Sequence, residues 1–310
     1  IVMRLVGSEM CIRDRASNLP TVWTNCLAAW VVNASTSQSL RVMPITSELS
    51  FLDQRTFLFL LAGASLIYAG GCTLNDAIDQ NFDARCNPLR PIPSGLISAS
   101  SVWTLGILEM GLGAWAMIEG AQCSPKWIIL LLLSVFLYNW LHKRWVGSFA
   151  LMGGCRFFLW MGAASAGNLT HVTPQTLLWG LVLGAYVMGI SLYAREESRE
   201  RKNPKSIAIF FLLAPPLTSL AGLILWNNLD PIRIFLINLI GLLAAWIAFC
   251  SILEMKTLNK EFFKTGISRL LAGICAIDAI ALCFVSPMLA GFSLLGVCFA
   301  QVLQKKFAAT

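Results

Sequence analysis

Charged side chains are scarce in this chain: 13% of its 310 residues are Asp, Glu, Lys or Arg, whereas 57% are hydrophobic. A soluble domain carries about 25% charged residues, so the composition excludes an ordinary soluble protein. Histidine is rarer still, because only His142 and His171 occur, too far apart to indicate a histidine-based metal centre. The cysteines form no CxxC pair and no zinc-ligand spacing, so we expect buried thiols that behave as small apolar residues.

Long apolar runs fill most of the sequence. A transmembrane helix needs about 20 mostly apolar residues, and continuous rather than alternating runs favour helices over a barrel. Such runs lie at 18–34, 56–76, 100–120, 126–141, 148–168, 174–195, 206–226, 231–253 and 266–285. A shorter stretch, 288–304, could span, re-enter or lie in the interface. The sequence therefore predicts an all-α membrane protein, a polytopic bundle of nine to ten transmembrane helices.

The first fifteen residues, "IVMRLVGSEMCIRDR", share no pattern with the rest and begin without Met. They resemble translated sequencing-adapter contamination more than a signal peptide, whose apolar region needs about 7–15 residues. We therefore expect residues 1–15 to be an artefactual leader and residues 16–310 to form one transmembrane domain.

Basic residues are concentrated in the loops after the second, fourth, sixth and eighth apolar runs. The positive-inside rule places those loops in the cytoplasm. The net charge of +7 follows this topology, so it does not indicate nucleic acid as a partner, and nothing indicates an obligate protein partner. Lys305 and Lys306 would join the same side if the last stretch spans, which favours ten crossings over nine.

Two acidic windows, 76–83 and 196–200, end even-numbered apolar runs and so should lie on one side of the membrane. In the first, Asn75, Asp79 and Asp83 are spaced i, i+4, i+8 and share a face if the helix continues. Like-charged carboxylates at this spacing need a cation between them or screening water. Oxygen ligands suit Mg²⁺, which usually reaches substrate phosphates through one or two carboxylates.

The second window lies in "YAREESRERKNPKS", where Glu196 and Glu200 share a helical face and Glu197 points elsewhere. Two facing acid clusters could hold two metal ions on one diphosphate, with Arg and Lys neutralising the remaining oxygens. The alternative interpretation is that both windows are solvated helix ends.

The string "NDAIDQNFD", followed by "RPIPSG", resembles the first signature of the UbiA-type intramembrane prenyltransferases, NDxxDxxxD with RPxxxG. "RASNLPTVWTN" at 15–25 is similar to the family's first-helix opening, and "YNWLHKR" at 138–144 to its Tyr…Lys-Arg element. "YAREESRERKNPKS" stands where the family has its second motif. That motif is typically DxxxD, whereas this chain has three glutamates, so the register stays open between Glu196 with Glu200 and Glu197.

This resemblance implies Mg²⁺-dependent transfer of a prenyl group from an allylic prenyl diphosphate to an acceptor. We expect an aromatic acceptor, such as a 4-hydroxybenzoate-like compound of quinone or prenyl-lipid biosynthesis. We also expect an active-site cavity that faces the cytoplasm, in a protein of the bacterial inner membrane. The implied catalytic acids are Asp76, Asp79, Asp83, Glu196 and Glu200. The implied metal ligands are Asn75, Asp79, Asp83, Glu196, Glu197 and Glu200. The implied diphosphate-binding bases are Arg90, Lys143, Arg144, Arg156 and Lys202.

Arg156 is a lone charge inside the fifth apolar run, where it needs a partner. We expect a carboxylate of the site or the substrate, with snorkelling to the interface as the alternative. Asp278 and Glu109 are intramembrane acids that could serve as that partner. Intramembrane charges also suit a multi-pass transporter, but we find no internal repeat, and the acidic windows lie at helix ends.

Overall fold

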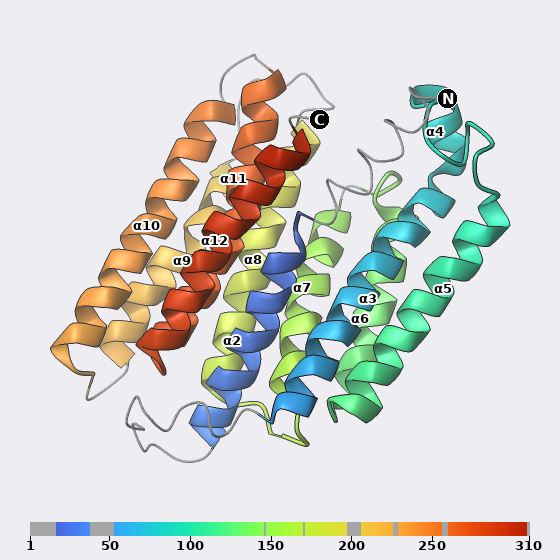
Figure 1. The fold of residues 1–310 in the computed structure, drawn as a ribbon. Helices are drawn as coiled ribbons and strands as arrows, with labels where there is room; N and C mark the ends of the chain where they lie inside the picture. The colour runs from blue at the N-terminus through green and yellow to red at the C-terminus, as the bar shows by residue number, and fades with distance from the viewer. Residues whose placement is uncertain are drawn as a thin grey trace.

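The computed structural model describes residues 17–37, 53–145, 147–169, 171–196, 206–225, 229–255 and 260–308. Within these ranges the regular structure is entirely helical (Figure 1). The helices are α2 (Leu19–Ser37), α3 (Gln54–Ile78), α4 (Gln80–Cys86), α5 (Ala99–Trp115), the π-helical turn η2 (Ala116–Gly120), α6 (Pro125–Leu141), α7 (Ser148–Ala164), α8 (Pro174–Glu196), α9 (Ser206–Leu225), α10 (Pro231–Met255), α11 (Lys260–Cys283) and α12 (Pro287–Ala308).

Each predicted apolar run coincides with a helix, and the largest shift is the earlier start of α11, at Lys260 rather than at 266. Six stretches of the described chain are long and apolar enough to cross a membrane: Gln54–Ile78, Ala99–Gly120, Pro174–Ala194, Pro231–Glu254, Thr265–Cys283 and Pro287–Gln304. The protein is therefore an all-helical, multi-pass membrane protein, as predicted. The count of nine or ten crossings stays a prediction, and residues 1–16 lie outside the described ranges.

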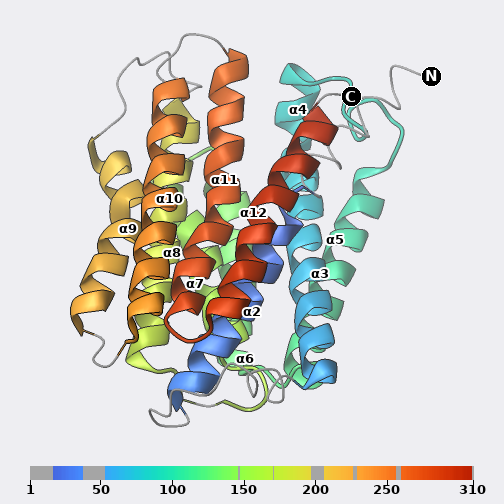
Figure 2. The same cartoon turned by 60° about the vertical axis from the view of Figure 1, so that its left-hand side comes forward.

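The central helix of the bundle is α2, which packs against α3, α7, α8, α11 and α12. Figure 2 shows α9 beside α10 at one edge of the bundle, and in Figure 1 helices α10 and α5 lie at its two opposite edges. Their outward faces carry large apolar side chains, among them Leu105, Leu112, Phe235 and Trp246, which suits contact with lipid. Helices α3 and α6 both end at the face of the bundle that carries α4 (Figure 1).

Glycines let α3 and α5 approach closely. A Cβ at Gly63 would come within 2.8 Å of the Gly113 carbonyl oxygen, and one at Gly70 within 2.9 Å of the Gly106 carbonyl oxygen. The two glycines on each helix are seven residues apart, so both contacts lie on one seam of an antiparallel pair. Small residues at such seams let backbones pack where lipid provides no hydrophobic driving force. This seam fixes the position of α3, whose end carries the first acidic window.

We expect Gly113→Leu to destabilise the protein, because the new side chain would meet the backbone of α3. Overpacking of this kind costs about 1–3 kcal/mol. The matched control is Gly111→Leu on the same helix, where an added Cβ meets nothing within 4 Å. Thermal unfolding in detergent should show a lower midpoint for Gly113→Leu and little change for Gly111→Leu. Equal midpoints for the two variants would contradict the seam.

Candidate active site

The first acidic window lies at the junction of α3 and α4. Asp79 separates the two helices with φ −81° and ψ 0°, close to helical values. The amide of Asp79 donates to the Asn75 carbonyl (2.9 Å) and the amide of Asp83 donates to the Asp79 carbonyl (2.9 Å). The backbone thus keeps a helical path through the junction.

Asp79 is paired with bases at the end of α6. Its Oδ1 lies 2.8 Å from Lys143 Nζ, and its Oδ2 lies 3.5 Å from His142 Nε2. Burial of Asp79, which is only 7% exposed, disfavours the ionised form. The hydrogen bonds and charges of His142 and Lys143 outweigh that effect and lower the pKa of Asp79 below its usual value. Lys143 Nζ also lies 3.6 Å from the centre of the Phe82 ring.

Asp83 is paired with a base from the loop after α4. Arg90 Nη1 lies 2.6 Å from Asp83 Oδ2 and 3.5 Å from Asp76 Oδ1, and Asn87 Nδ2 donates to Asp83 Oδ1 (3.3 Å). Asp83 is only 3% exposed. The loop folds back through backbone bonds, including Ser94 N to the Arg90 carbonyl (2.9 Å), so that Arg90 reaches the acids.

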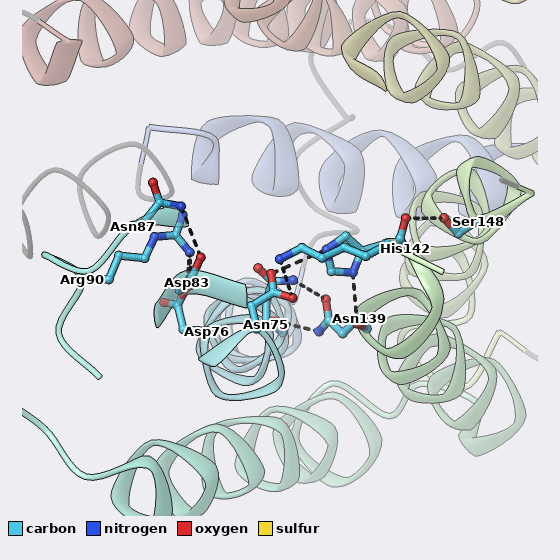
Figure 3. A network of polar contacts seen from close by, with 11 residues as sticks. Asn75, Asp76, Asp83, Asn87, Arg90, Asn139, His142 and Ser148 are labelled. Atoms are coloured by element: carbon cyan, nitrogen blue, oxygen red, sulfur yellow. Dashed lines mark hydrogen bonds and ion pairs between the residues drawn. The ribbon is translucent and has the colours of Figure 1, made fainter. Parts of the chain in front are cut away.

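An asparagine that the sequence analysis missed orients Asn75. Asn139 Nδ2 donates to the Gly71 carbonyl (2.9 Å), an atom that can only accept, so the oxygen of the Asn139 amide faces Asn75. Asn75 Nδ2 donates to that oxygen (3.3 Å), which turns Asn75 Oδ1 away from Asn139. The pairing therefore leaves the amide oxygen of Asn75 as the group available to a cation (Figure 3). Asn139 lies in the string "YNWLHKR", but no single sequence carries a signal for this role.

Three other residues named from the sequence, Arg144, Glu109 and Arg156, have partners other than Asp79 and Asp83. Arg144 lies 5.6 Å from the centre of the Trp140 ring. Glu109 accepts from Thr73 Oγ1 (2.8 Å), so it is engaged by α3 instead of Arg156. Arg156 contacts α2.

The second acidic window lies almost entirely outside the described residues. Glu196 ends α8, but its side chain and residues Glu197, Glu200 and Lys202 lie outside the described ranges. Helix α7 starts beside His142, to whose carbonyl Ser148 Oγ donates (3.4 Å). Helix α8 runs back antiparallel to α7, so it ends at the same face as α3 (Figure 1).

The donor set at the first window consists of oxygens. Within the described residues no three His, Cys, Asp or Glu side chains gather closely enough to hold a metal ion by themselves. Mg²⁺ that is bound through substrate phosphates needs only one or two carboxylates and waters. Asp79, Asp83 and the oriented oxygen of Asn75 fit that requirement.

The structure thus defines a class by its architecture: a helical membrane bundle with a cluster of paired carboxylates and bases at one end. The model of the UbiA prenyltransferase family matches residues 43–255, more than half of the chain. The chain therefore belongs to the UbiA prenyltransferase family, as its motifs predict.

Curated relatives match parts of the chain. A protoheme IX farnesyltransferase of Alkalihalophilus pseudofirmus is 32% identical over 141 residues, covering 45% of this chain and 40% of that protein. A polyprenyl transferase of Arthrobotrys oligospora is 27% identical over 203 residues, covering 62% and 51%. The matches thus span about half the length of these relatives or less.

Solved structures share the fold across almost the whole chain. An apo structure of a UbiA homolog from Aeropyrum pernix K1 has a TM-score of 0.59 at 13% identity and covers 91% of this chain and 96% of that chain. A second structure comes from work on the biosynthesis of digeranylgeranylglyceryl phosphate synthase in membranes. It has a TM-score of 0.59 at 17% identity and covers 92% of this chain and 98% of that chain.

We expect Asn139→Leu to weaken Mg²⁺ binding by about 10- to 100-fold, because it frees the Asn75 amide to turn. The measurement is the Mg²⁺ concentration at which added diphosphate raises the thermal midpoint of the purified protein. An exposed apolar residue of the same helix provides a control, Leu133→Ala, which should leave that concentration unchanged. An unaltered Mg²⁺ requirement in Asn139→Leu would show that Asn139 only packs α6 against α3.

Proposed function

We propose that the protein transfers a prenyl group from an allylic prenyl diphosphate to an acceptor, with the diphosphate bound at the end of α3. One observation carries the proposal: two nearly buried carboxylates are each paired with a base at the end of a membrane-spanning helix. Asp79 is paired with Lys143 (2.8 Å) and Asp83 with Arg90 (2.6 Å). A substrate with a charged head and an apolar tail fits a site where a polar cluster meets an apolar bundle.

The acid–base pairs suit an exchange of partners when substrate arrives. Arg90 and Lys143 can turn from the carboxylates to the phosphate oxygens, for which Arg offers a bidentate fork. The carboxylates of Asp79 and Asp83, with the oxygen of Asn75, would then hold Mg²⁺. Each group keeps a partner of opposite charge throughout, so the exchange leaves no buried charge unpaired.

Bound Mg²⁺ would supply positive charge to offset the negative charge that grows on the departing diphosphate. Arg90 and Lys143 would stabilise the same charge by hydrogen bonds already aimed at the head group. Cleavage of the carbon–oxygen bond gives free diphosphate and an allylic cation. The acceptor forms the new bond to this cation and loses a proton, which the departing diphosphate can take, and the bond must form before water reaches the cation. The apolar interior of the bundle excludes that water.

Several finer assignments belong to this proposal. We place the active site on the cytoplasmic side of a bacterial inner membrane, because the loops after even-numbered apolar runs are rich in Lys and Arg. We assign Arg144, Lys202 and the glutamates of the second window to the diphosphate and a second metal ion, as the family resemblance implies.

An aromatic acceptor remains our expectation. The similar proteins include a protoheme IX farnesyltransferase and chlorophyll synthases, so the acceptor differs from one similar protein to another.

The first test is metal dependence. Chelation with EDTA should abolish prenyl transfer in membranes, and added Mg²⁺ should restore it. Asp79→Asn and Asp83→Asn should each lower turnover by about 100-fold or more, since each removes several kcal/mol of charge stabilisation. Glu119→Gln, which changes an exposed carboxylate at the other end of the bundle, is the matched control and should keep full activity. Normal turnover in both aspartate variants would overturn the assignment.

The register of the second window gives a separate test. Glu200 lies one turn after Glu196 on a continuing helix, whereas Glu197 points about 100° away. We therefore expect Glu196→Gln and Glu200→Gln to raise the Mg²⁺ requirement and cut turnover, while Glu197→Gln changes little. If Glu197→Gln is the damaging change and Glu196→Gln is silent, the site has to be rebuilt around Glu197.

A further inference from the structure

A buried arginine lies at the end of the bundle opposite the first acidic window. Arg233 stands in the first turn of α10, which starts at Pro231 at the end away from α4 (Figure 1). The membrane-spanning stretch of α10 also begins at Pro231, so the backbone of Arg233 lies about 3 Å inside it. This is the level at which the apolar layer of a membrane meets the lipid head groups.

Asp230 occupies only one edge of the Arg233 guanidinium. Its Oδ2 lies 3.2 Å from Arg233 Nε, and its Oδ1 accepts from the backbone amide of Arg233 (2.8 Å). Nη1 and Nη2 have no hydrogen-bond partner within the part of the chain that the structure describes. The four N–H groups at the far end of the guanidinium are therefore unused.

The burial of this ion pair is the reverse of what is usual at a membrane helix end. Arginine commonly extends its charged group toward water there, whereas the Arg233 side chain is 8% exposed and that of Asp230 is 51% exposed. Arg233 lies instead near Cys283, the last residue of α11. Its Nη1 and Nη2 are nevertheless not fully enclosed, so a ligand can reach them. Donors that are largely shielded from water and lack a partner are costly, which favours an anionic ligand at this position.

The surface next to Arg233 is apolar. Ile232 and Phe235 on α10 and Met288 at the start of α12 are all exposed, and α12 follows directly after the end of α11. Exposed apolar side chains within a membrane-spanning stretch suit contact with acyl chains. A ligand that satisfies both features needs an anionic head with two acceptor oxygens and an apolar tail. Free phosphate has the head alone.

We propose that Arg233 binds the phosphate group of a membrane phospholipid through Nη1 and Nη2, in the leaflet at the end of the bundle away from α4. The planar end of the guanidinium matches two phosphate oxygens, and the acyl chains would cover Ile232 and Phe235. Asp230 keeps the Nε edge and orients the guanidinium. Because Asp230 is half-exposed, water and salt screen its repulsion of the phosphate. The bound lipid takes no part in prenyl transfer, so the proposal is independent of that function.

The test compares three probes by the concentration that gives half of the maximal rise in thermal midpoint of the full-length protein in detergent. The probes are phosphatidylglycerol, phosphatidylcholine with the same acyl chains, and inorganic phosphate. The two lipids share a phosphodiester and tails, but the choline cation pairs with phosphate and repels arginine. Inorganic phosphate supplies the anion without the tail, so it distinguishes a lipid head group from a free anion.

We expect the wild-type protein to bind phosphatidylglycerol about tenfold more tightly than phosphatidylcholine, and inorganic phosphate to stabilise it little. Arg233→Gln should remove the preference between the two lipids. Arg233→Lys keeps the charge without the planar fork, so it should give an intermediate preference. Arg55→Gln is the matched control, because Arg55 is an exposed arginine at the start of α3, at the same end of the bundle, and its guanidinium lies 5.8 Å from the centre of the Phe59 ring. It should keep the full preference.

Asp230→Asn separates the lipid site from a merely structural ion pair. If Arg233 serves only as the partner of Asp230, Asp230→Asn and Arg233→Gln should lower the midpoint without lipid equally, and both should keep the wild-type lipid preference. A lipid site predicts instead that Asp230→Asn retains or increases the preference for phosphatidylglycerol, because an anion beside the phosphate is removed.

Four results overturn the proposal. The first is a wild-type protein without a preference for phosphatidylglycerol, and the second is a preference that survives Arg233→Gln. The third is stabilisation by inorganic phosphate equal to that by phosphatidylglycerol at the same concentration, which would indicate a site for the free anion. The fourth is an equal loss of preference in Arg55→Gln, which would indicate attraction by the surface charge as a whole.

Discussion

The need to pair every charge in a medium without water governs the interior of this protein. An isolated ion in the membrane is costly, so buried acids and bases occur in mutually satisfied groups. Asp79 with Lys143, and Asp83 with Arg90, satisfy this need at the end of α3. Arg156 meets it through α2, where Thr21 accepts from its guanidinium and Asn25 connects it to Asp278.

The polar residues depend on an apolar scaffold for their positions. Helix α3 carries Asn75 and leads into Asp79 and Asp83, and its path is set by the glycine seam with α5. On the other side of α3, Asn139 joins α6 to the Gly71 carbonyl and to Asn75 at once. A Cβ at Gly71 would come within 2.9 Å of Val135 Cγ1, so this contact also requires a glycine. The absence of a side chain at these glycines lets the helices approach closely, so that a backbone carbonyl such as that of Gly71 can accept a hydrogen bond from Asn139.

The sequence predicted the helices well, because an apolar run of membrane-spanning length has few alternatives. The first acidic window was also predictable, since i, i+4, i+8 spacing survives the junction at Asp79. What could not be predicted is which base meets which acid. Arg90 reaches Asp83 only because its loop folds back, and Arg144 lies over Trp140 although it follows Lys143 directly. Such choices depend on loop paths and helix rotation, which residue spacing does not encode.

The partner of Arg156 was likewise not predictable from residue spacing. Its position in an apolar run indicated that it needed a partner, and Asp278 and Glu109 were the available acids. The structure connects it to Asp278 through an amide, a solution that charge counting cannot anticipate, and it engages Glu109 with Thr73. Tyr68 of α3 lies near Arg156, and Asn75 follows it seven residues later on the same helix face, about 10 Å along the axis, so one helix connects the level of Arg156 to the first acidic window.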